Sequence, residues 1–272
     1  MELVSIATPT TPLDGLFYQP PGPARGAAIL FHGNTMNFYT GALRFLPPVL
    51  LDLGLAVLAF NRRGHDILSI RNSRSAEGAA FQTTAEGIED NRIAAHWLAG
   101  RGFPAPFVIG HSNGGMLAVP HVLAHPQTPG LVLLSAHRGG HGPGLLAGFA
   151  ATGHLAQDAA EATLGTARAM VAAGQGDTLL LLPGWWYAIS AASYVDRMTT
   201  MPDIVALAPQ VACPSLFIRG DLESAEAYPV DAFAAASGGP CAAVVLEGCD
   251  HFYNDREPAV CAQVQFWLAA RI

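Results

Sequence analysis

One segment of the 272-residue chain carries residues that could act in nucleophilic catalysis, namely Gly110–Gly114 with the sequence GHSNG. It follows an apolar run that predicts a strand and opens a pattern that predicts a helix, which is the context in which a G-x-S-x-G pattern presents a serine nucleophile. Glycines flanking Ser112 allow a sharp turn from strand to helix, because a side chain there would collide with neighbouring backbone. The spacing therefore predicts Ser112 as a nucleophile at the carboxyl edge of a sheet.

Together with two other segments, this motif resembles the α/β-hydrolase superfamily, and the resemblance extends over nearly the whole chain. Phe31–Asn34 (FHGN) is similar to the family's His-Gly segment, and Asn61–His65 (NRRGH) is similar to its Arg-Gly-His turn, with Asn61 where aspartate is common. The resemblance implies a serine hydrolase of the esterase or lipase type. It also implies that the backbone amides of Asn34 and Asn113 form an oxyanion hole.

A serine nucleophile needs a base, and a carboxylate must hold that base in one tautomer. In the order nucleophile, acid, histidine that the resemblance implies, His251 follows the last predicted strand and is the candidate base. The acid stays open between two residues of an earlier loop. The family's usual spacing after a glycine favours Glu223, and Asp221 is the alternative, with Asp250 and Glu247 as weaker candidates.

Other catalytic constellations lack residues that they require. His121 and His125 are four residues apart, as are His137 and His141, and such a spacing on a helix can bind zinc. The glutamate of an HExxH site is missing after His121 and no third ligand is evident, so we expect no metal site and no organic cofactor. The Gly-x-Gly-x-x-Gly fingerprint of dinucleotide-binding proteins is also missing after the first predicted strand.

Composition excludes further classes. All 14 basic residues are arginine, so a Walker phosphate loop, a kinase lysine and a pyridoxal Schiff base are impossible. The net charge is −7 and the arginines are scattered, so we expect no nucleic acid partner. Because 51% of the residues are hydrophobic and only 13% are charged, the chain has enough apolar residues for a compact core.

The predicted elements alternate as an α/β protein requires. Short apolar runs predict strands that are buried on both faces, and helical patterns between them imply parallel connections. The predicted strands are residues 27–31, 55–60, 106–109, 131–135, 216–219 and 242–246, preceded by an antiparallel hairpin of 4–8 and 15–19. The predicted helices are residues 39–53, 84–98, 113–124, 230–236 and 258–270. The fold class is therefore a mostly parallel α/β-hydrolase sheet flanked by helices.

This alternation is interrupted once, by about 80 residues between two consecutive predicted strands, which is more than a crossover needs. We expect residues 1–136 and 209–272 to form the hydrolase core and residues 137–208 to form an inserted helical lid. The uncharged stretch 178–195 contains Pro183 and Gly184, so it predicts a pair of buried helices rather than a membrane span.

Three consecutive aromatic residues of the expected lid, Trp185, Trp186 and Tyr187, suggest how it shapes a pocket. They predict a small-molecule substrate with an apolar acyl or alcohol group, although the tryptophans could equally anchor the lid to the core.

The sequence thus predicts a serine hydrolase that cleaves a carboxylic ester or a related acyl substrate through an acyl-enzyme. Hydrolysis of a carbon–carbon bond, a thioester, a lactone or an amide would use the same residues. A non-catalytic ligand-binding protein on the same fold is the alternative from another class. The N-terminus lacks a basic region followed by an apolar run, so we expect a cytoplasmic protein without a membrane anchor.

Overall fold

The computed structural model of the protein describes residues 1–70, 76–141, 157–182 and 188–272. The strands of its main sheet are β1 (Glu2–Ile6), β2 (Leu13–Tyr18), β3 (Gly26–Phe31), β4 (Leu55–Phe60), β5 (Phe107–His111), β6 (Leu131–Leu134), β9 (Ser215–Gly220) and β10 (Cys241–Leu246). Their order is β1-β2-β4-β3-β5-β6-β9-β10. The six strands β4, β3, β5, β6, β9 and β10 are mutually parallel. Strands β2 and β1 continue the sheet beside β4 in antiparallel pairing. The predicted mostly parallel sheet with an antiparallel hairpin at its edge is confirmed.

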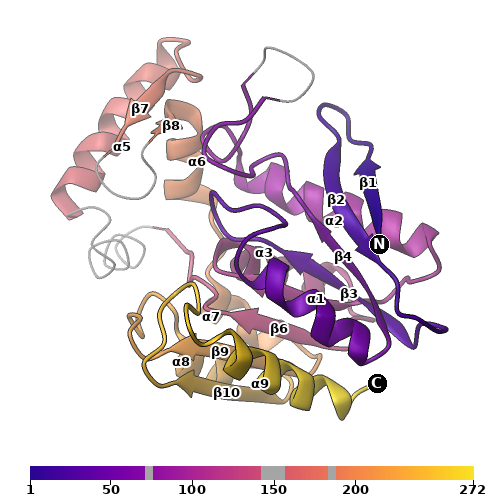
Figure 1. Cartoon of the computed structure of the whole chain (residues 1–272). Coiled ribbons are helices and arrows are strands. Elements are labelled where there is room, and N and C mark those ends of the chain that lie inside the picture. Colours follow the sequence, from indigo (N-terminus) through magenta and orange to yellow (C-terminus); the bar gives the residue numbers. More distant parts are fainter. Residues whose placement is uncertain (71–75, 142–156, 183–187) are drawn as a thin grey trace.

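Helices cover both faces of this sheet (Figure 1). Helices α1 (Ala42–Asp52) and α9 (Glu257–Ala269) pack on one face, and α2 (Thr84–Gly100), α3 (Asn113–Ala124) and α8 (Val230–Ala236) pack on the other. Each face therefore has its own apolar core. This arrangement explains why β4, β5, β6 and β9 are buried at every position rather than at every second one.

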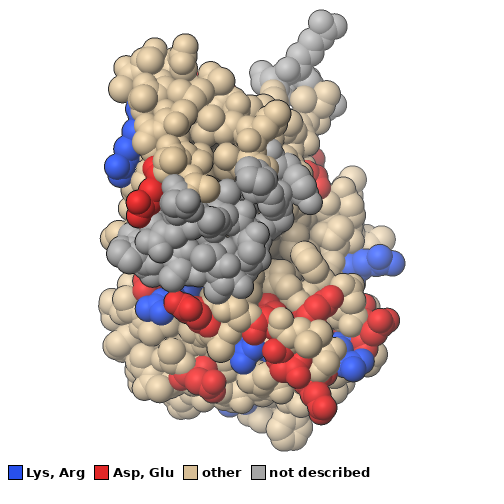
Figure 2. Space-filling view, turned by 90° about the vertical axis from the view of Figure 1, so that its left-hand side faces the viewer, with Lys and Arg blue, Asp and Glu red and all other residues tan. Residues whose placement is uncertain are grey.

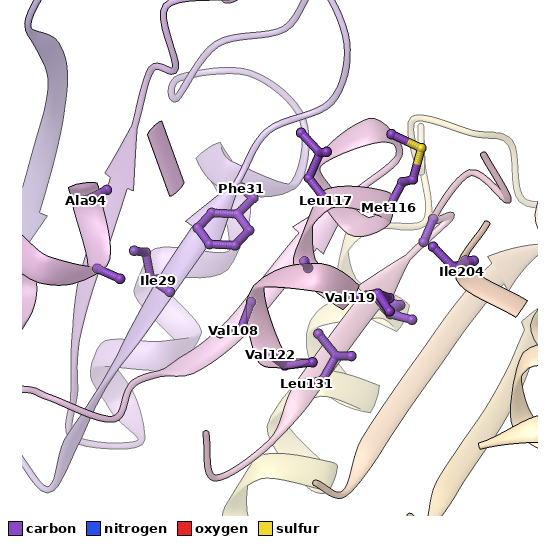
Figure 3. Packing of buried hydrophobic residues seen from close by; sticks show 14 of the residues in the cluster. Ile29, Phe31, Ala94, Val108, Met116, Leu117, Val119, Val122, Leu131 and Ile204 are labelled. Carbon is purple, nitrogen blue, oxygen red and sulfur yellow. The ribbon is translucent and has the colours of Figure 1, made fainter. Parts of the chain in front are cut away.

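The alternation of side chains along β3 illustrates how the two cores are separated. Ile29 and Phe31 face the core under α3, whereas Ala28 and Leu30 face the core under α1 and α9, as the two-residue period of a strand requires. Figure 3 shows Val119 and Val122 of α3 directed toward Leu131 of β6, in the core that also contains Ile29 and Phe31. Because α3 is anchored in this way, its N-terminus is held rigidly at the edge of the sheet.

Between β6 and β9 the chain forms α5 (Gln157–Ala172), β7 (Leu179–Leu181), β8 (Ala188–Ser190), α6 (Ala191–Thr200), α7 (Ile204–Leu207) and the short 3-10 helix η1 (Ala208–Gln210). The first four of these elements group together beyond one end of the sheet (Figure 1). The Oδ2 atom of Asp196 accepts a hydrogen bond from the backbone N–H of Thr84 at 2.6 Å, and Nη2 of Arg197 donates to the carbonyl oxygen of Ala79 at 2.9 Å. Helix α6 is therefore tied to the loop that follows β4.

The structure differs from the sequence-based prediction in residues 178–195. Instead of a pair of helices, the described residues form strands β7 and β8, which pair antiparallel, and the start of α6. The stretch has no helical period, and Pro183 lacks the backbone N–H that a helix running through it would need. None of the helices in the described ranges is both long and apolar enough to cross a membrane.

Helix α1 begins three residues later than predicted. Gly41 has a φ of 55°, a left-handed conformation that interrupts the helix, so residues 39–41 form the turn that precedes it. This turn belongs to the loop after β3, which contributes to the candidate active site described below.

The charged side chains are of mixed sign on the face of the molecule in Figure 2. Acidic and basic residues are interspersed over its lower part, whereas the surface above the grey residues is mostly uncharged. On this face the arginines lie among acidic neighbours and do not form a large basic patch in the described residues. The phosphates of a nucleic acid would find no concentrated positive charge there.

Candidate active site

Ser112 lies at the turn between β5 and α3, where the backbone takes a conformation that is rare for a residue with a side chain. Its φ and ψ are 55° and −120°. A Cβ atom added at Gly110 would lie 2.5 Å from the carbonyl oxygen of Gly114, and one added at Gly114 would lie 2.2 Å from that of Phe31. Both glycines are therefore required by the close approach of backbone segments, and the strained turn holds the serine at the carboxyl edge of the sheet.

The structure brings Ser112 together with two side chains that follow other strands. The Nε2 atom of His251, in the loop after β10, lies 3.1 Å from Oγ of Ser112. On the other side of the ring, Nδ1 lies 2.7 Å from Oε1 of Glu223, in the loop after β9. Because a carboxylate can only accept a hydrogen bond, the neutral imidazole carries its proton on Nδ1. Nε2 can then accept a proton from the hydroxyl of Ser112.

The carboxylate of Glu223 is buried, since only 3% of its side chain is exposed to solvent. Its Oε2 atom accepts hydrogen bonds from the backbone N–H of Gly220 at 2.8 Å and from the hydroxyl of Ser135 at 2.5 Å. Oγ of Ser135 is in turn 2.7 Å from the hydroxyl of Tyr253. Burial and the nearby carboxylate raise the pKa of Tyr253 well above its ordinary value, so the phenol keeps its proton and can donate it to Ser135.

Asp221, the alternative acid, has a different set of contacts. Its Oδ1 atom accepts a hydrogen bond from the backbone N–H of Cys249 at 3.1 Å, and its side chain is exposed to solvent. Hydrogen bonds from the backbone of Cys249 and Gly248 lower the pKa of Asp221. The carboxylate therefore joins the loop after β9 to the loop that carries His251, while Glu223 is the residue that contacts the imidazole.

The two expected oxyanion donors lie on either side of Ser112. Asn113 is the first residue of α3, where the helix dipole favours negative charge. Asn34 follows Gly33, and a Cβ atom added at Gly33 would lie 3.2 Å from Cβ of Ser112, so only a glycine allows this segment to approach the serine. Among the described residues, neither backbone N–H has a hydrogen-bond acceptor. Within the described part of the chain, neither amide is therefore engaged by the fold itself.

A buried arginine connects these two segments. Nη2 of Arg62 donates to the carbonyl oxygen of His32 at 2.6 Å and to Oδ1 of Asn113 at 3.1 Å, and its backbone N–H donates to Nε2 of His32 at 3.0 Å. Burial lowers the pKa of Arg62 to about 10, which leaves the guanidinium charged at neutral pH. Asn61, which stands where aspartate is common, accepts a hydrogen bond from the backbone of Phe38 at 2.8 Å through Oδ1, an interaction that an aspartate oxygen would also make.

Two further groups of residues stand out in the sequence. Trp185, Trp186 and Tyr187 lie outside the described residues. His121 and His125 stack on each other with ring centroids 4.2 Å apart. Within the described ranges no group of three or more histidine, cysteine, aspartate or glutamate side chains gathers as a metal site would require.

Sequence analysis missed several residues around the candidate triad. Ser135 contacts Glu223 directly, and Tyr253 contacts it through the hydroxyl of Ser135. His111 forms a hydrogen bond with the backbone of His251. The ring of Tyr228 lies 4.9 Å from the imidazole of His251. Of these residues, only His111 lies within one of the motifs named above, GHSNG. The others become visible through contacts between residues far apart in the chain.

Comparison with known proteins places this architecture in a family. The model of the α/β hydrolase family matches residues 28–264, and the chain therefore belongs to that family. In sequence, the chain matches no curated protein.

Three solved structures illustrate the similarity in fold. Est1E from Butyrivibrio proteoclasticus, solved with ferulic acid bound, superposes with a TM-score of 0.70 at 18% identity and covers 98% of each chain. A thermostable carboxyl esterase from Bacillus coagulans, in complex with glycerol, has a TM-score of 0.73 at 16% identity and covers 99% of this chain and 98% of its own. A proline iminopeptidase from Mycobacterium smegmatis has a TM-score of 0.64 at 15% identity and covers 99% and 98%. Proteins named for different reactions thus share the fold, so the reaction must be argued from the site.

Proposed function

We propose that this protein is a serine hydrolase that cleaves a carboxylic ester or a related acyl substrate through an acyl-enzyme intermediate. The observation that carries the proposal is the continuous hydrogen-bonded chain from Ser112 through His251 to Glu223, with distances of 3.1 Å and 2.7 Å. A nucleophile, a base and a carboxylate that orients the base are the components that acyl transfer requires.

In the proposed mechanism Ser112 attacks the substrate carbonyl while His251 accepts its proton. Glu223 holds the imidazole in the productive tautomer and stabilises the imidazolium that forms. The backbone amides of Asn34 and Asn113 donate to the developing oxyanion. His251 then returns the proton to the leaving alcohol, and a water molecule activated by the same histidine releases the acyl group. The mechanism uses side chains and backbone of this chain alone.

Ester cleavage is the proposed reaction because an alcohol leaves readily with a single proton from His251. The same residues could hydrolyse a thioester, a lactone, an amide or a carbon–carbon bond, so a substrate series must accompany the test. We also propose that residues 137–208 form a lid over a core of residues 1–136 and 209–272. This division is supported by the elements α5 to α7, which interrupt the sequence of the parallel strands between β6 and β9.

The proposal is tested with a fluorophosphonate probe, which phosphonylates activated serines, and with a series of p-nitrophenyl esters of increasing acyl length. We expect labelling at Ser112, and we expect Ser112→Ala to remove labelling and to lower kcat by about 10⁴-fold to 10⁶-fold. Ser5→Ala, in the edge strand β1, is a matched control that should keep full activity. Retention of more than a few per cent of the turnover in Ser112→Ala would exclude this serine as the nucleophile.

A further inference from the structure

A groove of about 810 Å³ opens beside the candidate triad. It is lined by residues of the segment 35–45, in the loop after β3 and the start of α1, by residues of the segment 252–257 between His251 and the start of α9, and by Asp66. The mechanism proposed above uses none of these side chains. The proposed mechanism therefore gives the groove no role.

One end of the groove lies beside the candidate base. Phe252 lines it and directly follows His251, and the centroids of these two rings are 5.1 Å apart. Met36 lines it as well, and a Cβ atom added at Gly33 would lie 2.7 Å from the sulfur of Met36 and 3.2 Å from Cβ of Ser112. A group bound at this end would thus lie beside Phe252, whose ring adjoins the imidazole of His251.

The position of the groove indicates which part of an ester it would hold. In the proposed mechanism His251 gives its proton to the leaving oxygen, which must come within hydrogen-bond distance of Nε2. One wall of the groove is formed by Phe252, Asn254 and Glu257, which follow His251 in the chain. The alcohol part of the substrate, rather than the acyl part, therefore extends along this wall.

The lining of the groove is polar, since seven of its eleven residues carry hydroxyl, amide or charged side chains. Some of them are held in place by neighbours. Nδ2 of Asn37 donates to Oδ1 of Asp66 at 2.9 Å, and Nδ2 of Asn254 donates to a carboxylate oxygen of Asp250 at 2.7 Å. The side chain of Arg44 has no hydrogen-bond partner within the part of the chain that the structure describes. The lining thus offers oriented acceptors and a donor to a ligand.

The same lining excludes two kinds of alcohol. An aliphatic chain would remove these amide and charged groups from water without replacing their hydrogen bonds, which is unfavourable. An anionic group would meet the carboxylates of Asp66 and Glu257, against the single positive charge of Arg44. A neutral alcohol with several hydroxyl groups satisfies both conditions. Phe252, which is 50% exposed, supplies an apolar surface for the carbon–hydrogen face of such a molecule.

We propose that this groove binds the leaving alcohol of the substrate and that this alcohol is neutral and rich in hydroxyl groups, as in a sugar or another polyol. The inference rests on the proposed ester hydrolysis. It separates the two halves of the substrate, because an apolar group would then belong to the acyl side.

The test compares two esters with the same acyl group, glucose acetylated on its primary hydroxyl and cyclohexylmethyl acetate. The second has a six-membered ring of similar size without hydroxyl groups. We expect kcat/KM to be at least about tenfold higher for the sugar ester, the effect of one or two added polar contacts. The double variant Arg44→Leu/Glu257→Leu should lower this ratio toward one. Glu89→Leu, which removes a carboxylate paired with Arg92 on the surface of α2, is the control and should leave the ratio unchanged.

The outcomes separate this proposal from the one on which it rests. If the fluorophosphonate probe labels Ser112 but both esters are cleaved with equal kcat/KM, or if the double variant keeps the wild-type ratio, the groove does not hold a hydroxylated alcohol and the assignment as a hydrolase stands. If the probe fails to label Ser112, the proposed function itself is wrong.

Discussion

The Nε2–H of His111 donates a hydrogen bond to the backbone carbonyl oxygen of His251 over 2.9 Å, so the residue before the candidate nucleophile holds the backbone of the candidate base. Because a carbonyl oxygen can only accept, this contact defines the tautomer of His111. Burial, with a smaller contribution from His251, lowers the pKa of His111 to about 3, and the ring therefore stays neutral at ordinary pH. The two loops that must meet during catalysis are thus joined independently of the triad.

A first prediction concerns this contact. His111→Leu removes the donor at a similar volume, and we expect kcat to fall about tenfold with little change in KM, because a carbonyl left without its partner costs about 1 to 3 kcal/mol and allows the His251 loop to shift. His111→Gln restores an N–H donor and should recover part of the loss. Steady-state kinetics of the two variants measure this difference. If His111→Leu and His111→Gln have equal kcat, the hydrogen bond does not position the base.

A second prediction distinguishes the two carboxylates after β9. Glu223→Gln should lower kcat by up to about 10⁴-fold, because an amide cannot hold the imidazole in the same tautomer. Asp221→Asn should reduce kcat far less and instead lower the melting temperature, because its carboxylate accepts a hydrogen bond from the backbone of Cys249. Parallel measurements of kcat and thermal unfolding separate these effects. A larger loss of kcat in Asp221→Asn would reverse the assignment of the acid.

A third prediction addresses the hydroxyls behind Glu223. Ser135→Ala removes a charge-assisted hydrogen bond to Oε2, and such bonds contribute about 1.5 to 3 kcal/mol. We therefore expect kcat to fall by about tenfold or more. Tyr253→Phe leaves the contact between Ser135 and Glu223 in place and should have a smaller effect. If Tyr253→Phe proves more damaging than Ser135→Ala, the hydroxyl of Tyr253 acts on the site by another route, such as its hydrogen bond to the carbonyl oxygen of Ile218.

A fourth prediction concerns stability at acidic pH. Burial lowers the pKa of His32 well below its ordinary value of 6.5, and lowers the pKa of His111 and of His121 to about 3. Below pH 6.5 these three histidines therefore bind protons in the unfolded chain but not in the folded one. The free energy of unfolding falls as the pH decreases. Each histidine contributes up to about 1.4 kcal/mol per pH unit to this slope well below pH 6.5 and about half of that at pH 6.5, and its contribution to the slope vanishes above about pH 7.5.

Denaturant titrations between about pH 7 and pH 5 measure the slope. His121→Gln removes one of the three groups and should make the dependence shallower by about 1 kcal/mol per pH unit on average over this range, whatever its effect on stability at pH 7. His96→Gln, on the surface of α2, is the matched control and should leave the slope unchanged. An unaltered slope in His121→Gln would show that this histidine binds its proton as readily in the folded protein as in the unfolded chain.

Much of the fold could be predicted because its signals are local. The apolar runs of β3, β4 and β5 are continuous, which is the pattern of strands buried between helices, and GHSNG occurs where a strand meets a helix. The prediction was wrong for residues 178–195, whose lack of charge indicated burial but did not distinguish helices from short strands. Such a run has no periodicity that decides between the two.

The sequence by itself determined the parallel sheet, the strained turn at Ser112 and the position of His251 after the last strand, since each depends on residues close together in the chain. Only the tertiary structure decided that Glu223 rather than Asp221 contacts the imidazole, and that Ser135, 88 residues before Glu223, donates to its carboxylate. Two carboxylates two residues apart in one loop have the same local signals. Which of them reaches the histidine depends on how the loops after β6, β9 and β10 meet at the edge of the sheet, and that meeting is set by the packing of the whole domain.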